Sequence, residues 1–174
     1  RDITAESELF TGEHGVGAIL PFVARFFPDA KLVPVVISVD TRQADWDRLV
    51  AILKPLIDRD TLIVQSTDFS HYLPLAQSLV RDQETLNVLS ARDDAAVPAL
   101  RQSDHLDSKA AQYVQMRLQS ALGAIGPIIV ASRNAYEYRP IGGATTYVVQ
   151  LYAAQEPPPE QLRYKDHEVL YFGG

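Results

Sequence analysis

The chain has no cysteine among its 174 residues. Disulfides, thiolate nucleophiles, iron–sulfur clusters and zinc sites built on sulfur are therefore excluded, so any metal must be held by histidine and carboxylate side chains. Basic side chains are also few, since 16 Lys and Arg stand against 22 Asp and Glu and the formal net charge is -6. The basic residues are scattered along the chain, whereas phosphate recognition needs them clustered. This distribution argues against a nucleic-acid partner.

Long apolar runs are missing as well. No run approaches the roughly 20 residues of a membrane-spanning helix, and no basic-then-apolar leader resembles a signal peptide. The sequence therefore predicts a cytoplasmic protein with no membrane partner. It also has no P-loop, no GxSxG elbow and no dinucleotide fingerprint, so NTP use, serine hydrolysis and NAD binding have no support. What the chain does have is 47% hydrophobic residues, enough for one domain with a real core.

Two apolar runs predict buried strands. LVPVVISV at residues 32–39 is rich in β-branched side chains, and TLIVQS at residues 61–66 is the second such run. Continuous runs of this kind are typical of strands buried on both faces of a mostly parallel sheet. Two further strands are predicted at residues 127–139 and 144–153, separated by the Gly-rich segment PIGG.

Helices are predicted between these strands. Residues 73–90 show mixed periodicity, whereas residues 108–124 place their apolar side chains on one helical face. Strands that alternate with helices predict an α/β fold, a three-layer domain with a mostly parallel central sheet flanked by helices, over residues 1–154. The segment EPPPEQ cannot hold a helix or a central strand, so residues 155–174 are predicted to be a Pro-rich linker and a C-terminal tail.

Polar side chains follow the second predicted strand at the point where it ends. The segment STDFSHY places Asp68 and His71 there, three residues apart. Open α/β sheets bind ligands outside the carboxyl ends of their strands. If the chain turns helically here, the two side chains share a face, as a metal pair or a carboxylate-oriented general base requires. The alternative is a helix cap at Asp68 with an exposed His71.

Two other histidines are candidate site residues. His14 lies in TGEHGVGAILPF, where glycines let the backbone come close to a ligand, but a loop histidine that caps the following helix is the plainer interpretation. His105 lies in RQSDHLDSKA, and a structural role is favoured there because Asp107 or Ser108 is a good N-cap for the long helix.

Taken together and in this order, EHGVGAILPF, LVPVVIS and STDFSHY resemble the Memo family, also called AmmeMemoRadiSam system protein B. The resemblance covers roughly residues 8–153. That family is similar in fold to class III extradiol dioxygenases, which use non-haem iron, so the resemblance implies a three-layer α/β domain with a metal-centred site. It also implies catalytic roles for His14, Asp68 and His71, which match site residues of the family.

The chain also departs from the family pattern. Two metal-binding histidines of the family belong to upstream motifs resembling PHAGY and SHH, and neither motif occurs in this sequence. The family's later CG pair aligns best with Asp107 and Ser108, and an aspartate at this position can bind a hard metal ion. The resemblance therefore implies Asp107 as the carboxylate ligand. We expect non-haem iron or copper in the complete protein and no metal tightly bound to this chain alone.

Two functions stay open at this point. The first is metal-dependent oxidation of a small molecule by a dioxygenase-like oxidoreductase whose site is only partly present in this chain. The second is a non-catalytic binding or adaptor module that keeps the crevice and takes a small molecule or a peptide. A domain of this family without its first strands leaves an open sheet edge and an uncovered apolar face. We therefore expect a homodimer, or a complex with a missing N-terminal segment.

Overall fold

The computed structural model of the chain describes residues 8–155. Its strands β1 (His71–Leu73), β2 (Ile125–Asn134) and β3 (Ala144–Ala153) form a three-stranded sheet in the order β1-β3-β2. Both pairings are antiparallel, with Ile129 opposite Gln150 and His71 opposite Thr145. The two predicted strands around PIGG are thus confirmed as neighbours. The first strand differs from its predicted bounds at both ends, because it begins at Ile125 and residues 135–137 form a 3-10 turn.

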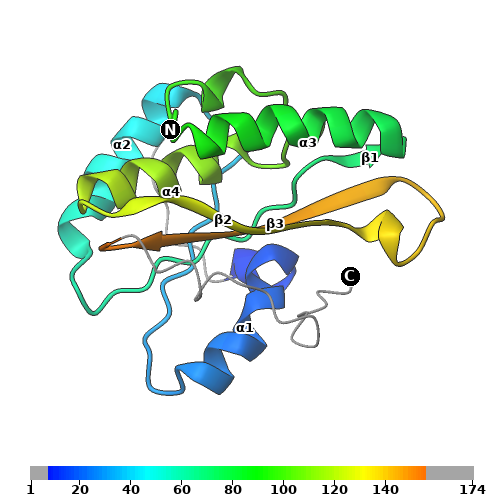
Figure 1. The fold of residues 1–174 in the computed structure, drawn as a ribbon. Helices are drawn as coiled ribbons and strands as arrows, with labels where there is room; N and C mark the ends of the chain where they lie inside the picture. The colour runs from blue at the N-terminus through cyan, green and yellow to red at the C-terminus, as the bar shows by residue number, and fades with distance from the viewer. Residues whose placement is uncertain (1–7, 156–174) are drawn as a thin grey trace.

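Helices cover both faces of this sheet, with α3 and α4 on one side and α1 on the other (Figure 1). The α-helices are α1 (His14–Phe26), α2 (Gln43–Leu53), α3 (Leu75–Ser90) and α4 (Lys109–Ala121). The predicted N-cap of α4 is confirmed, since the Ser108 hydroxyl accepts a hydrogen bond from the backbone N–H of Ala111 at 3.1 Å. None of the helices in residues 8–155 combines the length and the apolarity that crossing a bilayer requires.

The core lies between the sheet and the helices α2, α3 and α4. Its best buried side chains, at most 2% exposed, are Phe69, Leu89, Val97, Leu106 and Leu118. Phe69 and Leu106 belong to irregular segments that follow no helix or strand pattern, yet they are as well buried as the helical residues. The core therefore anchors the two segments that carry Asp68 and Asp107.

The prediction of a mostly parallel sheet is wrong for the described residues. Residues 32–39 and 61–66, the two runs that predicted it, join no β-ladder, and residues 32–39 run as irregular chain between α1 and α2 (Figure 1). Most of their apolar side chains are exposed, with Val33 78%, Val39 70% and Leu62 64% exposed, whereas Ile37 and Ile63 pack partly buried against the core. The β-branched pattern was recognised correctly, but a strand forms only where another strand offers backbone partners. The remaining sheet is small and antiparallel as a result.

The predicted boundary between the domain and the tail, after residue 154, falls at the end of the described residues. Of the predicted linker and tail, only Gln155 lies within the described residues.

These exposed apolar segments lead to a prediction about association. Replacing Val33, Val39 and Leu62 together by threonine is expected to lower the associated fraction of the protein, because exposed apolar stretches pair with other chains. Light scattering over a concentration series measures the effect. Val80→Thr is the matched control, since Val80 is 56% exposed but lies on α3. A parent protein that is monomeric at every concentration would contradict the expectation, as would a triple variant that associates equally.

Candidate functional site

Two chain segments that are distant in sequence meet at the candidate site. The backbone N–H of Asp107 donates to the carbonyl of Asp68 at 2.9 Å. The adjacent residues Phe69 and Leu106 pair as an isolated antiparallel bridge, and both side chains are buried. The buried pair therefore places the two aspartates side by side at the edge of the core.

The carboxylate of Asp107 is the most unusual group of this site. Its Oδ1 atom is buried and has no hydrogen-bond partner among the described residues. Burial raises the pKa of Asp107 above its ordinary value, and the negative charge of Asp68 raises this pKa further. The charges of His71 and His14 act in the opposite direction. The other three residues singled out in the sequence, Asp68, His71 and His14, thus all influence the pKa of this one carboxylate.

His71 begins β1 and has a defined tautomer. Its Nδ1 lies 2.8 Å from the carbonyl oxygen of Phe69, which can only accept a hydrogen bond, so Nδ1 carries the proton. When the ring is neutral, its Nε2 atom has the lone pair that can take a proton or a ligand. The helical turn considered for this segment does not form, and Asp68 caps no helix, because α3 begins at Leu75 with Pro74 at its N-cap.

His14 is the first residue of α1, and its side chain is exposed. The helix cap is its neighbour Glu13, whose carboxylate accepts from the N–H groups of Gly15 at 3.1 Å and Val16 at 2.7 Å. The bond from Val16 is the main cause of a lowered pKa of Glu13. His14 is therefore not required as a cap, and the helix α1 that it begins lies on the sheet side that α3 and α4 do not cover (Figure 1).

The contacts of His105, unlike those of His14 and His71, indicate a structural role. Its ring is buried, with Nε2 2.8 Å from the Glu84 carboxylate, and Nδ1 accepts from the N–H of Arg101 at 3.0 Å. Both ring nitrogens are engaged within the fold, which agrees with the structural role favoured from the sequence.

Two neighbours of the site were missed from the sequence. The pKa of Tyr147 is raised first by burial and then by the charge of Asp68, so this tyrosine of β3 belongs to the same surroundings. The hydroxyl of Thr67 is buried without a hydrogen-bond partner among the described residues, directly before Asp68. Thr67 could have been found by its position at the end of an apolar run, whereas the proximity of Tyr147 depends on the pairing of distant strands.

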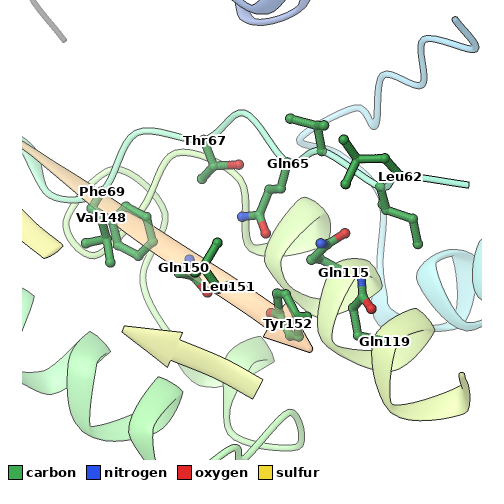
Figure 2. A pocket seen from close by; sticks show the side chains of 12 residues that line it. Leu62, Gln65, Thr67, Phe69, Gln115, Gln119, Val148, Gln150, Leu151 and Tyr152 are labelled. Atoms are coloured by element: carbon green, nitrogen blue, oxygen red, sulfur yellow. The ribbon is translucent and has the colours of Figure 1, made fainter. Parts of the chain in front are cut away.

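A pocket of about 280 Å³ lies beside this site, between residues 62–69, α4 and β3 (Figure 2). Uncharged side chains line it, among them Thr67, Gln115, Gln150 and Tyr152. Burial raises the pKa of the Tyr152 hydroxyl, which keeps it neutral. None of the four candidate residues lines this pocket, although Thr67 and Phe69 flank Asp68 in the chain.

The site has the types of donor atom that a hard or borderline metal ion prefers, but it has too few of them. Carboxylate oxygens and a neutral imidazole nitrogen are ordinary ligands of iron and copper. Within residues 8–155, however, no group of three or more such side chains is arranged to hold a metal ion. Further ligands would have to come from outside this part of the chain.

The raised pKa of Asp107 predicts a pH dependence of stability. A carboxyl whose folded pKa exceeds its unfolded value binds its proton more tightly in the folded state. The free energy of unfolding therefore falls as the pH rises from the ordinary value of 3.8 through the raised pKa. Asp107→Asn is expected to remove this contribution and to be more stable than the parent at pH 7. Urea unfolding between pH 4 and pH 7 measures the difference.

The control for this experiment is Asp29→Asn, which changes an exposed carboxylate. This control is expected to follow the parent at every pH. If Asp107→Asn were less stable than the parent at pH 7 and showed the same pH slope, the fold would stabilise Asp107 in its ionised form, and the raised pKa would be wrong.

Comparison with known proteins identifies the family of this chain. A family model described as "Memo-like protein" matches residues 3–142. A MEMO1 family protein of Saccharolobus solfataricus is 30% identical over 96 residues, which are 53% of this chain and 33% of that protein. A MEMO1 family protein of Methanopyrus kandleri is 29% identical over 100 residues, or 55% of this chain and 34% of that protein.

A third relative, a MEMO1 family protein of Pyrobaculum aerophilum, is 27% identical over 99 residues, 56% of this chain and 35% of that protein. No solved structure gives a significant match. The matched regions span about a third of the length of each curated relative. Because the family model covers most of its residues, the chain belongs to the Memo-like protein family.

Proposed function

We propose that this chain supplies part of a small-molecule site, in which carboxylates bind a positively charged group and an imidazole moves a proton. The observation that supports this proposal most is the buried Oδ1 of Asp107, which lacks a hydrogen-bond partner among the described residues and lies beside a second carboxylate. A buried unpaired carboxylate is costly, and a cation in contact with it would offset that cost. The site is therefore suited to an occupant that carries positive charge.

Each candidate residue has a role that follows from its position. Asp107 and Asp68 would contact the cationic group, since they adjoin through a backbone hydrogen bond. His71 would accept or return a proton at Nε2, because its Nδ1 is held by a carbonyl. His14, exposed at the start of α1, would orient or protonate the substrate.

The reaction that we propose for the complete protein is metal-dependent oxidation of a small molecule, as in a dioxygenase-like oxidoreductase. Asp107 would be a carboxylate ligand of non-haem iron or copper, and the remaining ligands would come from outside the described residues. The resemblance to the extradiol dioxygenase relatives supports this reaction class. Residues 8–155 alone do not supply the number of ligands that such a metal centre requires. A cytoplasmic location likewise stays a prediction.

A second function is favoured by that same incomplete ligand set. A chain that keeps the crevice but does not gather three ligands in its described part would serve as a binding or adaptor module for a small molecule or a peptide. The homodimer, or the complex with an N-terminal segment, fits either function and is tested by the light-scattering concentration series.

Anaerobic equilibrium dialysis against iron(II) separates the two functions. If the carboxylates form part of a metal site, the chain binds iron(II) weakly, with a dissociation constant of roughly millimolar, and Asp107→Asn weakens binding by about tenfold or more. Asp104→Asn is the control, because this nearby carboxylate pairs with Arg101 instead. Equal binding by the parent and Asp107→Asn would argue for the adaptor module.

A further inference from the structure

Five polar side chains form a buried ring of hydrogen bonds under the segment that leads into β1. They come from four parts of the chain, and each is at most 7% exposed: Ser70, Ser78, Asp82, Asn134 and Thr146. Ser78 and Asp82 lie on α3, Asn134 ends β2, and Thr146 lies in β3. Asp82 is a carboxylate, yet all its side-chain hydrogen-bond partners in the described part of the chain are neutral hydroxyls.

The amide of Asn134 fixes the direction of the ring. Its Oδ1 accepts from the backbone N–H of Tyr136 at 2.9 Å, which assigns the other amide atom as the donor nitrogen. That nitrogen donates to the hydroxyl of Thr146 at 2.8 Å and to the hydroxyl of Ser78 at 3.1 Å. Two arms of hydrogen bonds therefore start at Asn134.

Both arms end on Asp82. In one arm Ser70 donates to Oδ1 of Asp82 at 2.6 Å. The Ser70 and Ser78 hydroxyl oxygens are 2.6 Å apart, and because the single Ser70 proton goes to Asp82, Ser78 is assigned as the donor between them. In the other arm Thr146 donates to Oδ2 of Asp82 at 2.6 Å. Each hydroxyl proton is used once in these two arms, and both carboxylate oxygens of Asp82 accept a hydrogen bond.

The ring adjoins the candidate site through Ser70, which lies between Phe69 and His71. Backbone bonds of 2.9 Å also join Phe69 N–H to the carbonyl of Thr146, and Thr146 N–H to the carbonyl of Ser70. The side chain and the backbone of Ser70 are therefore held at the same time. The carbonyl of Phe69, one residue away, is the group that fixes the tautomer of His71.

We propose that Asp82 is a positioning residue, whose hydrogen-bonded ring holds the Phe69–His71 segment so that Nδ1 of His71 keeps its hydrogen bond to the Phe69 carbonyl and Nε2 is the ring nitrogen left for the site. An apolar contact resists only changes of volume, whereas a complete ring of directional bonds selects one orientation of each member. This positioning role requires no particular reaction, and only the importance of the His71 orientation rests on the proposed function.

The test uses variants of the ring and nitrogen-15 spectra of the histidine rings at one fixed pH. Asp82→Asn places an amide where an acceptor oxygen is needed, and Thr146→Val removes one hydroxyl arm. Thr146→Ser keeps the hydroxyl and is the conservative control. Leu89→Ala is the control for destabilisation, because Leu89 is fully buried on the same helix but takes no part in the ring.

The expected result is a mixed tautomer of His71 in Asp82→Asn and Thr146→Val, together with amide exchange of residues 69–71 that is faster by about tenfold or more. Thr146→Ser and Leu89→Ala keep the parent tautomer. The inference is overturned if both ring variants keep the parent tautomer and exchange rate, or if Leu89→Ala shifts them equally. Should Asp82→Asn not fold, the Thr146 pair decides. A failure to bind iron(II) would contradict the proposed function but would leave these spectra unchanged.

Discussion

Replacing Phe69 by alanine is expected to lower the free energy of unfolding by about 3–5 kcal/mol. The phenyl ring is 2% exposed and lies in the hydrophobic core, so its removal leaves a cavity that the neighbouring side chains cannot fill completely. Its backbone N–H also donates to Thr146, and it pairs with Leu106. The loss should therefore loosen the junction that joins Asp68 to Asp107. Urea unfolding followed by circular dichroism measures it.

Phe27→Ala is the matched control for this experiment. Phe27 is 50% exposed at the end of α1, so the same truncation there is expected to change stability by less than about 1 kcal/mol. Equal losses for the two variants would show that Phe69 is not packed as described.

Gly143→Ala is expected to cost about 1–3 kcal/mol through overpacking. A Cβ atom at Gly143 would lie 2.8 Å from the Cα of Tyr72 and 3.1 Å from its carbonyl carbon. These are backbone atoms, which cannot swing aside, and Tyr72 already has a positive φ of 61°. The substitution should displace the backbone next to His71. Thermal unfolding and the nitrogen-15 spectrum of His71 both report on it.

Gly12→Ala serves as the control, because a Cβ atom there would have no neighbour within 4 Å. Its stability and its His71 spectrum should match those of the parent. Were Gly143→Ala to leave both unchanged, the close approach of Gly143 to the Tyr72 backbone would be wrong.

Local patterns in the sequence were sufficient for the elements that depend on local interactions. Ser108 was a recognisable N-cap, and α4 follows it with its apolar face buried. The PIGG segment correctly joined two neighbouring strands. By contrast, residues 32–39 and 61–66 predicted parallel strands from composition alone, and a ladder needs partner strands that the described residues do not provide.

The mixed periodicity of residues 73–90 has a physical explanation. The helix α3 buries polar side chains, among them Ser78, Asp82 and Thr85, while its apolar residues Leu79 and Val80 are 55% and 56% exposed. Apolar periodicity in the sequence cannot identify the buried face of such a helix, because that face is mostly polar. The buried ring depends on partners up to 64 positions away, as between Asp82 and Thr146, so it could not be predicted from sequence spacing.

The candidate site was predictable only in part for the same reason. Asp68 and His71 could be selected because they end an apolar run, and Asp107 entered through the family resemblance. Their electrostatic contact depends on the pairing of Phe69 with Leu106, which no local pattern shows. The tautomer of His71 depends on the single carbonyl of Phe69, and no sequence pattern predicts this contact either.

The most direct test of the central claim, that Asp68 and Asp107 bind a cation beside His71 and His14, is a manganese(II) titration of protein with nitrogen-15-labelled histidine. Paramagnetic broadening identifies the rings near the ion, even when binding is weak. We predict that the signals of His71 and His14 broaden at a lower manganese concentration than the signal of the buried His105. Combining Asp68→Asn with Asp107→Asn should remove this difference between the histidines. Broadening of His105 at the same manganese concentration, or an order that the double substitution does not change, would contradict the claim.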